Sequence, residues 1–382
     1  MVIGIKKSGV FFRKSSSKYG HGWLNILNTT YFPQKLTSNF IFSVIVLMWM
    51  ALIKFTNKGI YCPRGDFYID PWKPVNLAVT THGHADHVKA GNQAYLCHQL
   101  TKPILLHRLG PDLKIQTLAY AEQLQINGVH LSLHPAGHVI GSAQVRLEYK
   151  GEVCVVSGDY KVIYDGISTA FEPVKCHTFV SESTFGLPIY NWLPQEDIFD
   201  QIGNWINTNQ QQQKTSVLTA YSLGKAQRLI KGLSNTSQKI YVHSSIANLN
   251  EVFLKAGVPL PKTIRISPEI SKSELQGGIV IVPPAVAEGR WIKTLTRPVV
   301  GVCSGWMQVR AARRWRSSDA GFALSDHADW PGLLSAVQAT NAEKVYVTHG
   351  YTAIFSKYLN EIGIAAEEVK TQYGTEDEEE IN

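Results

Sequence analysis

The stretch from Thr81 to His87, with the sequence THGHADH, constrains this chain more than any other. It places three histidines and a carboxylate within six residues, directly after the apolar run LAVT, which predicts a short buried strand. His82 and His84 are two residues apart, so on an extended strand end their side chains point the same way. Asp86 and His87 follow in a turn that we expect to open a helix. Imidazoles with a carboxylate suit Zn²⁺ and similar divalent metals, so the stretch predicts a metal site, with a surface cluster of histidines as the alternative.

More histidines and carboxylates stand where other predicted strands end. Asp70 closes a predicted strand twelve residues before His82 and is either a partner of the histidine loop or an ordinary turn residue. His138 lies in a glycine-containing loop, and His134 in the strand before that loop is the competing ligand. Asp159 follows a hairpin predicted over 143–156, a place from which its two oxygens can bridge two metals.

Three further candidates come later in the chain. Glu182, His327 and His349 each end or directly follow an apolar run that predicts a strand. Between the first two, strands alternate with helices and predict a small parallel α/β unit. That unit contains no glycine-rich phosphate motif, so a nucleotide cofactor has no support.

The net charge of +7 is mostly a property of the first 49 residues, which hold six Lys and Arg and no Asp or Glu. The remaining 31 basic residues face 30 acidic ones, so the charge of the body does not predict nucleic-acid binding. The leader ends in an apolar run too short to span a bilayer comfortably. We interpret it as an upstream extension from a misassigned start, with a membrane anchor or a targeting segment as alternatives.

Five scattered cysteines without a Cys-x-x-Cys pair indicate free thiols in a reducing compartment. We therefore expect a cytoplasmic protein without stable membrane association. At 382 residues the chain is long enough for two lobes, and its five consecutive carboxylates at 376–380 predict a solvated tail.

The order of these residues resembles the β-CASP branch of the metallo-β-lactamase superfamily, and within it most closely the bacterial ligase-associated DNA exonucleases. The resemblance covers the chain from Met50 to about residue 365. The motifs that carry it are GDFYIDPW at 65–72, YLCH at 95–98, FEPVKCH at 171–177, STFGLPIY at 183–190, LGKAQRL at 223–229, SGWM at 304–307 and SDHADWPGL at 325–333.

The resemblance implies an α/β fold, an αββα metallo-β-lactamase sandwich with an inserted small α/β β-CASP domain. The expected parts are a leader at 1–49, core segments at 50–187 and 311–370, the insert at 188–310 and an acidic tail at 371–382.

The resemblance also implies two divalent metal ions, Zn²⁺ first and Mn²⁺ as the alternative. His82, His84, His138 and Asp159 would hold one ion. Asp86, His87 and His349 would hold the other, sharing Asp159, with Asp70 supporting them from behind. Two such ions can activate a bridging water to attack phosphorus and can stabilise charge on the phosphate oxygens.

The catalytic residues implied are Asp86, Glu182 and His327. His327 would act as the general acid with Glu182 bonded to it, which raises a histidine pKa and fixes its tautomer. The alternative is a structural pair that closes the two lobes.

Basic residues are the candidates for substrate binding, and an ordinary solvated face is the alternative for a run of arginines. They are Lys225, Arg228, Arg310, Arg313 and Arg314. Tyr221 and Trp306 could stack on bases, although aromatic side chains more often belong to a core.

The expected function is a metal-dependent DNA exonuclease of DNA repair, associated with an ATP-dependent DNA ligase and a helicase. Alternatives are a β-CASP ribonuclease in RNA 3′-end processing, an inactive nucleic-acid-binding scaffold, and a small-molecule hydrolase of the superfamily. The sequence does not separate DNA from RNA, or end-on from internal cleavage.

Overall fold

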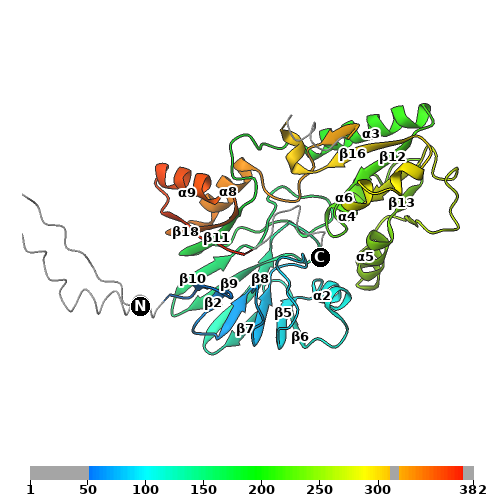
Figure 1. The fold of residues 1–382 in the computed structure, drawn as a ribbon. Coiled ribbons are helices and arrows are strands. Elements are labelled where there is room, and N and C mark those ends of the chain that lie inside the picture. The colour runs from blue at the N-terminus through cyan, green and yellow to red at the C-terminus, as the bar shows by residue number, and fades with distance from the viewer. Residues whose placement is uncertain (1–50, 310–317, 373–382) are drawn as a thin grey trace, which may run out of the picture. The chain divides into compact units, whose positions relative to one another are not determined.

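The computed structural model describes residues 51–309 and 318–372, which belong to one compact unit, Ala51–Asn382. Their strands form three sheets (Figure 1). The predicted leader, the arginine-rich stretch around residue 313 and all but the start of the predicted tail lie outside the described residues.

The first sheet has six strands that lie in chain order, from β1 to β6. They are β1 (Lys54–Thr56), β2 (Gly59–Cys62), β3 (Phe67–Ile69), β4 (Leu77–Thr80), β5 (Ala94–His98) and β6 (Ile115–Leu118). β4, predicted from the run LAVT, pairs in parallel with both β3 and β5. Its carboxyl end therefore carries the histidine stretch to one edge of this sheet.

The second sheet has seven strands in the order β19-β18-β11-β10-β9-β8-β7. They are β7 (Gln123–Ile126), β8 (Val129–Pro135), β9 (Ala143–Tyr149), β10 (Glu152–Val156), β11 (Thr178–Ser183), β18 (Lys344–Gly350) and β19 (Ala366–Glu368). The predicted hairpin over 143–156 is confirmed by the antiparallel pair β9 and β10. Its turn residues Lys150 and Gly151 both have positive φ, 51° and 85°, as a tight hairpin turn requires.

These two sheets pack face to face. Val79 and Leu96 of the first sheet share one buried cluster with Leu131 and Leu147 of the second. Side chains alternate between the faces of each strand, so the opposite faces need their own cover.

Helices supply that cover on both outer faces. α2 (Lys102–Leu109) packs on the first sheet through Leu105. α8 (Trp330–Thr340) and α9 (Thr352–Glu361) pack on the second through Leu333 and Phe355, beside β18 and β11 in Figure 1. The layers thus run helix, sheet, sheet, helix, which is consistent with the predicted metallo-β-lactamase fold.

The third sheet lies between the two core segments in sequence and is parallel throughout, in the order β14-β13-β15-β12-β16-β17. Its strands are β12 (Thr215–Thr219), β13 (Ile240–Val242), β14 (Ile264–Arg265), β15 (Ile279–Val282), β16 (Pro298–Cys303) and β17 (Ala320–Phe322). The predicted parallel α/β unit is thereby confirmed. Because β17 pairs with β16, the sheet continues beyond residue 310, the predicted end of the insert. The assignment of this unit as a β-CASP domain stays a prediction.

Helices of the third unit follow amphipathic patterns. α3 (Gln195–Gln211) buries Ile198, Ile202 and Ile206, which recur every four residues and therefore share one face. This face packs with α4 (Lys225–Gly232) and the start of α5 (Ser244–Lys255) on the sheet. The other short helices that the structure describes in this unit are α6 (Pro284–Ala287), η1 (Ile292–Thr294) and η2 (Gly305–Gln308).

Candidate metal centre

The loop after β4 is anchored by Asp70. Its Oδ1 accepts a hydrogen bond from the Thr81 backbone N–H at 2.8 Å, and its Oδ2 accepts from Thr81 Oγ1 at 2.5 Å and from His87 Nδ1 at 2.8 Å. The helix expected at Asp86 is limited to a single turn: the Val88 N–H bonds to His84 O at 3.0 Å in the α-helical pattern, and residues 85–87 form a turn that is not continued. The carboxylate of Asp70 thus ties the start of this loop at Thr81 to its end at His87.

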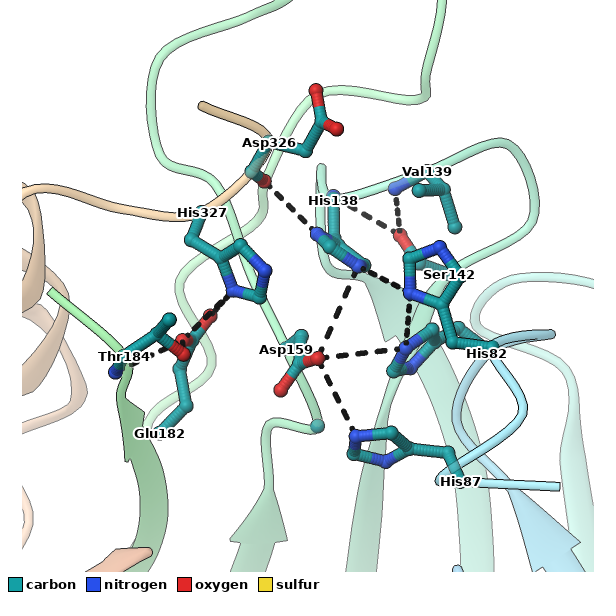
Figure 2. Close-up of polar contacts among 12 residues, drawn as sticks. His82, His87, His138, Val139, Ser142, Asp159, Glu182, Thr184, Asp326 and His327 are labelled. Atoms are coloured by element: carbon teal, nitrogen blue, oxygen red, sulfur yellow. Dashed lines mark hydrogen bonds and ion pairs between the residues drawn. The ribbon is translucent and has the colours of Figure 1, made fainter. Parts of the chain in front are cut away.

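Four side chains converge in the first group, His82, His84, His138 and Asp159. His84 Nδ1 lies 3.2 Å from His82 Nε2 and 3.1 Å from His138 Nε2. Asp159 Oδ2 lies 3.5 Å from His82 Nε2 and 3.9 Å from His138 Nε2 (Figure 2). Ligands about 2.0–2.1 Å from a tetrahedral Zn²⁺ lie about 3.3 Å apart, so these separations fit a metal ion.

Each of the three imidazoles turns its other nitrogen to an oxygen. His138 Nδ1 bonds to Asp326 O at 2.9 Å, and His84 Nε2 bonds to Leu223 O at 3.3 Å. His82 Nδ1 lies 3.0 Å from Thr81 Oγ1, whose own proton goes to Asp70. Since a carbonyl oxygen only accepts, these nitrogens donate, and the converging nitrogens present lone pairs.

The second group is formed by Asp86, His87 and His349. His87 Nε2 lies 3.3 Å from Asp86 Oδ2 and 3.4 Å from Asp159 Oδ2. His349 Nδ1 lies 3.8 Å from the other oxygen, Asp159 Oδ1. Asp159 therefore stands between the two groups, as Figure 2 shows for His82, His138 and His87.

Backbone conformation brings these strand ends together. Gly158 has φ 58°, and a Cβ there would lie 2.6 Å from Thr81 Oγ1. His349 also has positive φ, 56°, directly before Gly350, where a Cβ would lie 2.3 Å from Ser183 O. The two loops approach their neighbours too closely for larger residues at these glycines.

Burial and mutual charge set the protonation of the groups. Burial, reinforced by His138, lowers the pKa of His84 to about 3, and burial also lowers the pKa of His82 and of His138. Burial would lower the pKa of His87 as well, but Asp86 and Asp159 outweigh it and raise that pKa. The three histidines of the first group are thus held neutral, which is the form of imidazole that binds metal.

The two aspartates provide a test of whether a cation fits. Both are buried, and burial would raise their pKa, but the attraction of His87 outweighs it and keeps the pKa of each carboxyl low. Within residues 51–309 and 318–372, neither oxygen of Asp86 nor Oδ2 of Asp159 has a hydrogen-bond donor. A buried carboxylate without donors is costly, and a divalent cation between the groups would compensate it. The donor set of imidazoles and carboxylates therefore fits two metal ions.

Glu182 and His327 form a pair beside the first group. His327 Nδ1 lies 3.0 Å from both Glu182 oxygens, which also accept from the Tyr160 N–H at 2.7 Å and from Thr184 Oγ1 (Figure 2). The ring centroid of His327 lies 4.6 Å from that of His138. These bonds fix the orientation of the carboxylate, so the Nδ1 side of the ring faces Glu182 and the Nε2 side faces away from it.

The other predicted residues divide into two kinds. The competing ligand His134 bonds to Ser132 Oγ at 3.1 Å and belongs to neither group. Lys225 and Arg228 are buried, at 0% and 3% exposed, so neither presents its charge to solvent, and their contact with nucleic acid stays a prediction. Arg310, Arg313 and Arg314 lie outside the described residues.

Two aromatic candidates have neighbours of their own. Tyr221 is buried beneath the Lys225 ammonium, whose Nζ lies 4.5 Å from the ring centroid. Trp306 packs on Phe185 with centroids 4.9 Å apart. A cavity of about 450 Å³ adjoins the first group at His84, and its lining includes Tyr221, Arg108 and Asn248.

Sequence reasoning missed the supporting oxygens. Leu223 and Asp326 contribute backbone carbonyls, which no side-chain pattern reveals, and no role is predicted from the sequence for the Asp326 carboxylate. The signal available was the position of Asp326 directly before His327.

No helix among the described residues is long and apolar enough to cross a membrane. No protein family model matches the chain.

The chain is similar to several known proteins. It is 29% identical over 317 residues to a protein of Opitutus terrae named "Probable DNA ligase", which covers 82% of this chain but only 30% of that protein. It is 29% identical over 119 residues to the cleavage and polyadenylation specificity factor 73 of Drosophila melanogaster, covering 31% of this chain and 17% of that protein. An RNase J-like protein of Methanocaldococcus jannaschii is 22% identical over 215 residues, covering 48% and 50% of the two chains.

A solved structure is similar in fold. A protein of unknown function from Enterococcus faecalis matches with a TM-score of 0.56 and 12% identity, covering 78% of this chain and 80% of that one. Together the similarities support the relation to the metallo-β-lactamase superfamily, and the ligase-associated subtype stays a prediction. The chain spans less than a third of the Opitutus relative.

Proposed function

We propose that this chain is a metal-dependent phosphodiesterase that degrades DNA from an end during DNA repair, alongside an ATP-dependent DNA ligase and a helicase. The observation that carries the proposal is the position of Asp159 between two groups of histidines and carboxylates, with the Glu182–His327 pair beside them. The similarity to the Opitutus protein named as a probable DNA ligase supports the association with ligation.

The residues have separate tasks in this scheme. His82, His84, His138 and Asp159 would hold one divalent ion, and Asp86, His87, His349 and Asp159 the other, with Zn²⁺ favoured by the imidazoles. When bound, the ions would supply Lewis acidity and an activated water for attack on phosphorus. Asp70 keeps His87 in the tautomer that presents Nε2 to the centre, because its Oδ2 accepts from Nδ1 at 2.8 Å.

His327 serves the leaving group. As the bond from phosphorus to the leaving oxygen breaks, its electron pair goes to that oxygen, which then takes a proton from His327 Nε2. Glu182, which faces Nδ1 at 3.0 Å, stabilises the imidazolium that donates this proton and holds the ring in place. The pair lies next to His138, so acid and metal ligands face one reaction site.

A nucleotide has room beside this site. The cavity of about 450 Å³ reaches His84 and falls within the range of small-ligand pockets. Its lining combines apolar side chains with Arg108, Ser245 and Asn248, which can meet a base and a phosphate.

A ribonuclease is the second candidate, favoured by a specific observation. The chain is 29% identical over 119 residues to the endoribonuclease YSH1 of Yarrowia lipolytica, although this covers only 31% of the chain. The scissile group is a phosphodiester in both nucleic acids, so the centre serves either one.

The test is degradation of end-labelled single-stranded DNA and RNA of matching sequence by the full chain loaded with Zn²⁺ or Mn²⁺. Stepwise shortening of DNA, absent in a His84→Ala variant, is the expected result, and the labelled end gives the polarity. Preferential cleavage of RNA would show that RNA, and not DNA, is the substrate. Cleavage of neither by protein that holds two metal ions would refute the nuclease proposal.

A further inference from the structure

The third unit reaches the metal centre through the start of α4. Leu223, two residues before the helix, offers its carbonyl to His84 Nε2 at 3.3 Å. The first turn then carries Lys225 and Arg228, both buried. The hydrolytic scheme uses neither cation, yet burying a charge is costly unless it is paired.

Both cations meet one carboxylate, that of Asp326. Arg228 Nη1 lies 3.3 Å from Asp326 Oδ1, and Lys225 Nζ lies 3.6 Å from Asp326 Oδ2. The guanidinium also donates from Nη1 to Ser325 O and from Nε to Gln195 Oε1, the latter at 2.8 Å. One planar fork thus ties α4 to a side chain of α3 and to two successive residues of the segment before His327.

The segment from Ser325 to His327 orients the side chain of His138 and carries His327 itself. Asp326 O accepts from His138 Nδ1 at 2.9 Å, which turns His138 Nε2 toward the first group. The His327 N–H donates to Ser325 Oγ at 3.1 Å, and the His327 ring extends from here to Glu182. A displacement of this segment would move a metal ligand and the general acid together.

We propose that Lys225 and Arg228 are positioning residues: by holding Asp326 they fix the segment 325–327, and through it the orientation of His138 and His327. The link to His327 rests on the proposed function, whereas the link to His138 requires only that the group binds a metal. This task differs from the phosphate contact predicted for the same residues, because it needs them buried and paired.

The first test measures metal binding by metal-stripped full-length protein, using Zn²⁺ in competition with a chromophoric chelator. Partners that orient metal-ligating histidines typically change metal affinity by about 10- to 100-fold when removed. We expect Arg228→Met to weaken Zn²⁺ binding by this factor, and Arg228→Lys, which keeps the charge but loses the fork, by less. Lys231→Met is the matched control, since Lys231 lies exposed on the same helix and should bind Zn²⁺ like the wild type.

The second test separates positioning of the acid from general damage. At saturating Zn²⁺, turnover of DNA is compared with that of bis(p-nitrophenyl) phosphate, whose leaving group departs without a proton. We expect Arg228→Met to lower the ratio of DNA to aryl-diester turnover by about 10-fold or more. A loss of folded protein would lower both activities equally and leave this ratio unchanged.

The two measurements test the link to His138 and the link to His327 separately. Wild-type Zn²⁺ affinity in Arg228→Met would overturn the link to His138, and a wild-type turnover ratio would overturn the link to His327. If circular dichroism shows that Arg228→Met does not fold, Arg228→Lys decides by the same two readouts. Failure of the wild type to cleave either DNA or RNA would refute the proposed function, while the Zn²⁺ titration would still test the link to His138.

Discussion

Acidification should destabilise the metal-free protein, because three histidines of the first group are buried in their neutral form. Burial and His138 lower the pKa of His84 from 6.5 to about 3. When a histidine has a lower pKa in the folded chain than in the unfolded chain, stability falls as the pH drops below the unfolded pKa, since the unfolded chain takes up the proton first. For His84 alone, the free energy of unfolding falls by about 2 kcal/mol between pH 7.5 and pH 5.

The other titrating groups set the net effect. Burial also lowers the pKa of His82 and of His138, so both add losses of the same sign over the same window. His87 opposes them, because its carboxylate neighbours raise its pKa and the stability that it contributes grows as the pH falls toward 6.5. Burial lowers the pKa of His98, His134 and His243 as well, which adds losses of the same sign. Against the gain from His87, we expect a net loss of about 2 kcal/mol or more.

The assay is urea unfolding of metal-stripped protein at both pH values, followed by tryptophan fluorescence. A His84→Asn variant, which cannot titrate, should lose about 2 kcal/mol less between the two pH values than the wild type. Equal free energies of unfolding at pH 7.5 and pH 5 would refute the reasoning, as would the same pH dependence in the variant and the wild type.

Three further substitutions test single residues, and a fourth, Gly203→Ala, is the control for one of them. His327→Gln should lower DNA turnover by about 10²- to 10⁴-fold but leave bis(p-nitrophenyl) phosphate turnover within a few-fold, and equal losses on both substrates would contradict its role as the acid. Asp70→Asn should weaken Zn²⁺ binding by about 10- to 100-fold in a chelator competition, because Asp70 orients His87 through a 2.8 Å bond. Unchanged Zn²⁺ affinity would show that His87 keeps its orientation without the Asp70 carboxylate. Gly158→Ala should lower both the amount of bound Zn²⁺ and the melting temperature, because the new Cβ would lie 2.6 Å from Thr81 Oγ1. The control is Gly203→Ala within α3, where a Cβ would meet no atom within 4 Å; it should raise the free energy of unfolding by up to about 1 kcal/mol.

Much of the fold could be predicted because local patterns and packing agree. β4, from the run LAVT, and the hairpin of β9 and β10 over 143–156 were predicted with their observed bounds, since their apolar residues are bounded by turn signals. The helix expected at Asp86 was wrong beyond one turn, and the fixed position of His87 depends on Asp70, which is distant in the sequence. The third sheet extends to β17 because β17 pairs with β16. A strand of three residues is too short for its sequence to predict this pairing.

The candidate ligands could be named because their spacing and strand-end positions are visible in one dimension. The sequence could not predict which nitrogen of each histidine faces the metal site. Asp326 O and Leu223 O each accept a hydrogen bond from one ring nitrogen and leave the other nitrogen facing the site. The burial of Lys225 and Arg228 was also hidden, because a basic residue at a helix start has the same sequence whether it faces solvent or Asp326.

The proposed function requires two metal ions that share Asp159. The most direct measurement is anomalous diffraction at the zinc edge from crystals of the full chain loaded with Zn²⁺. We expect two peaks, with Asp159 between them. One should lie among His82, His84 and His138 and the other among Asp86, His87 and His349. A single peak, or peaks away from these two groups, would contradict it.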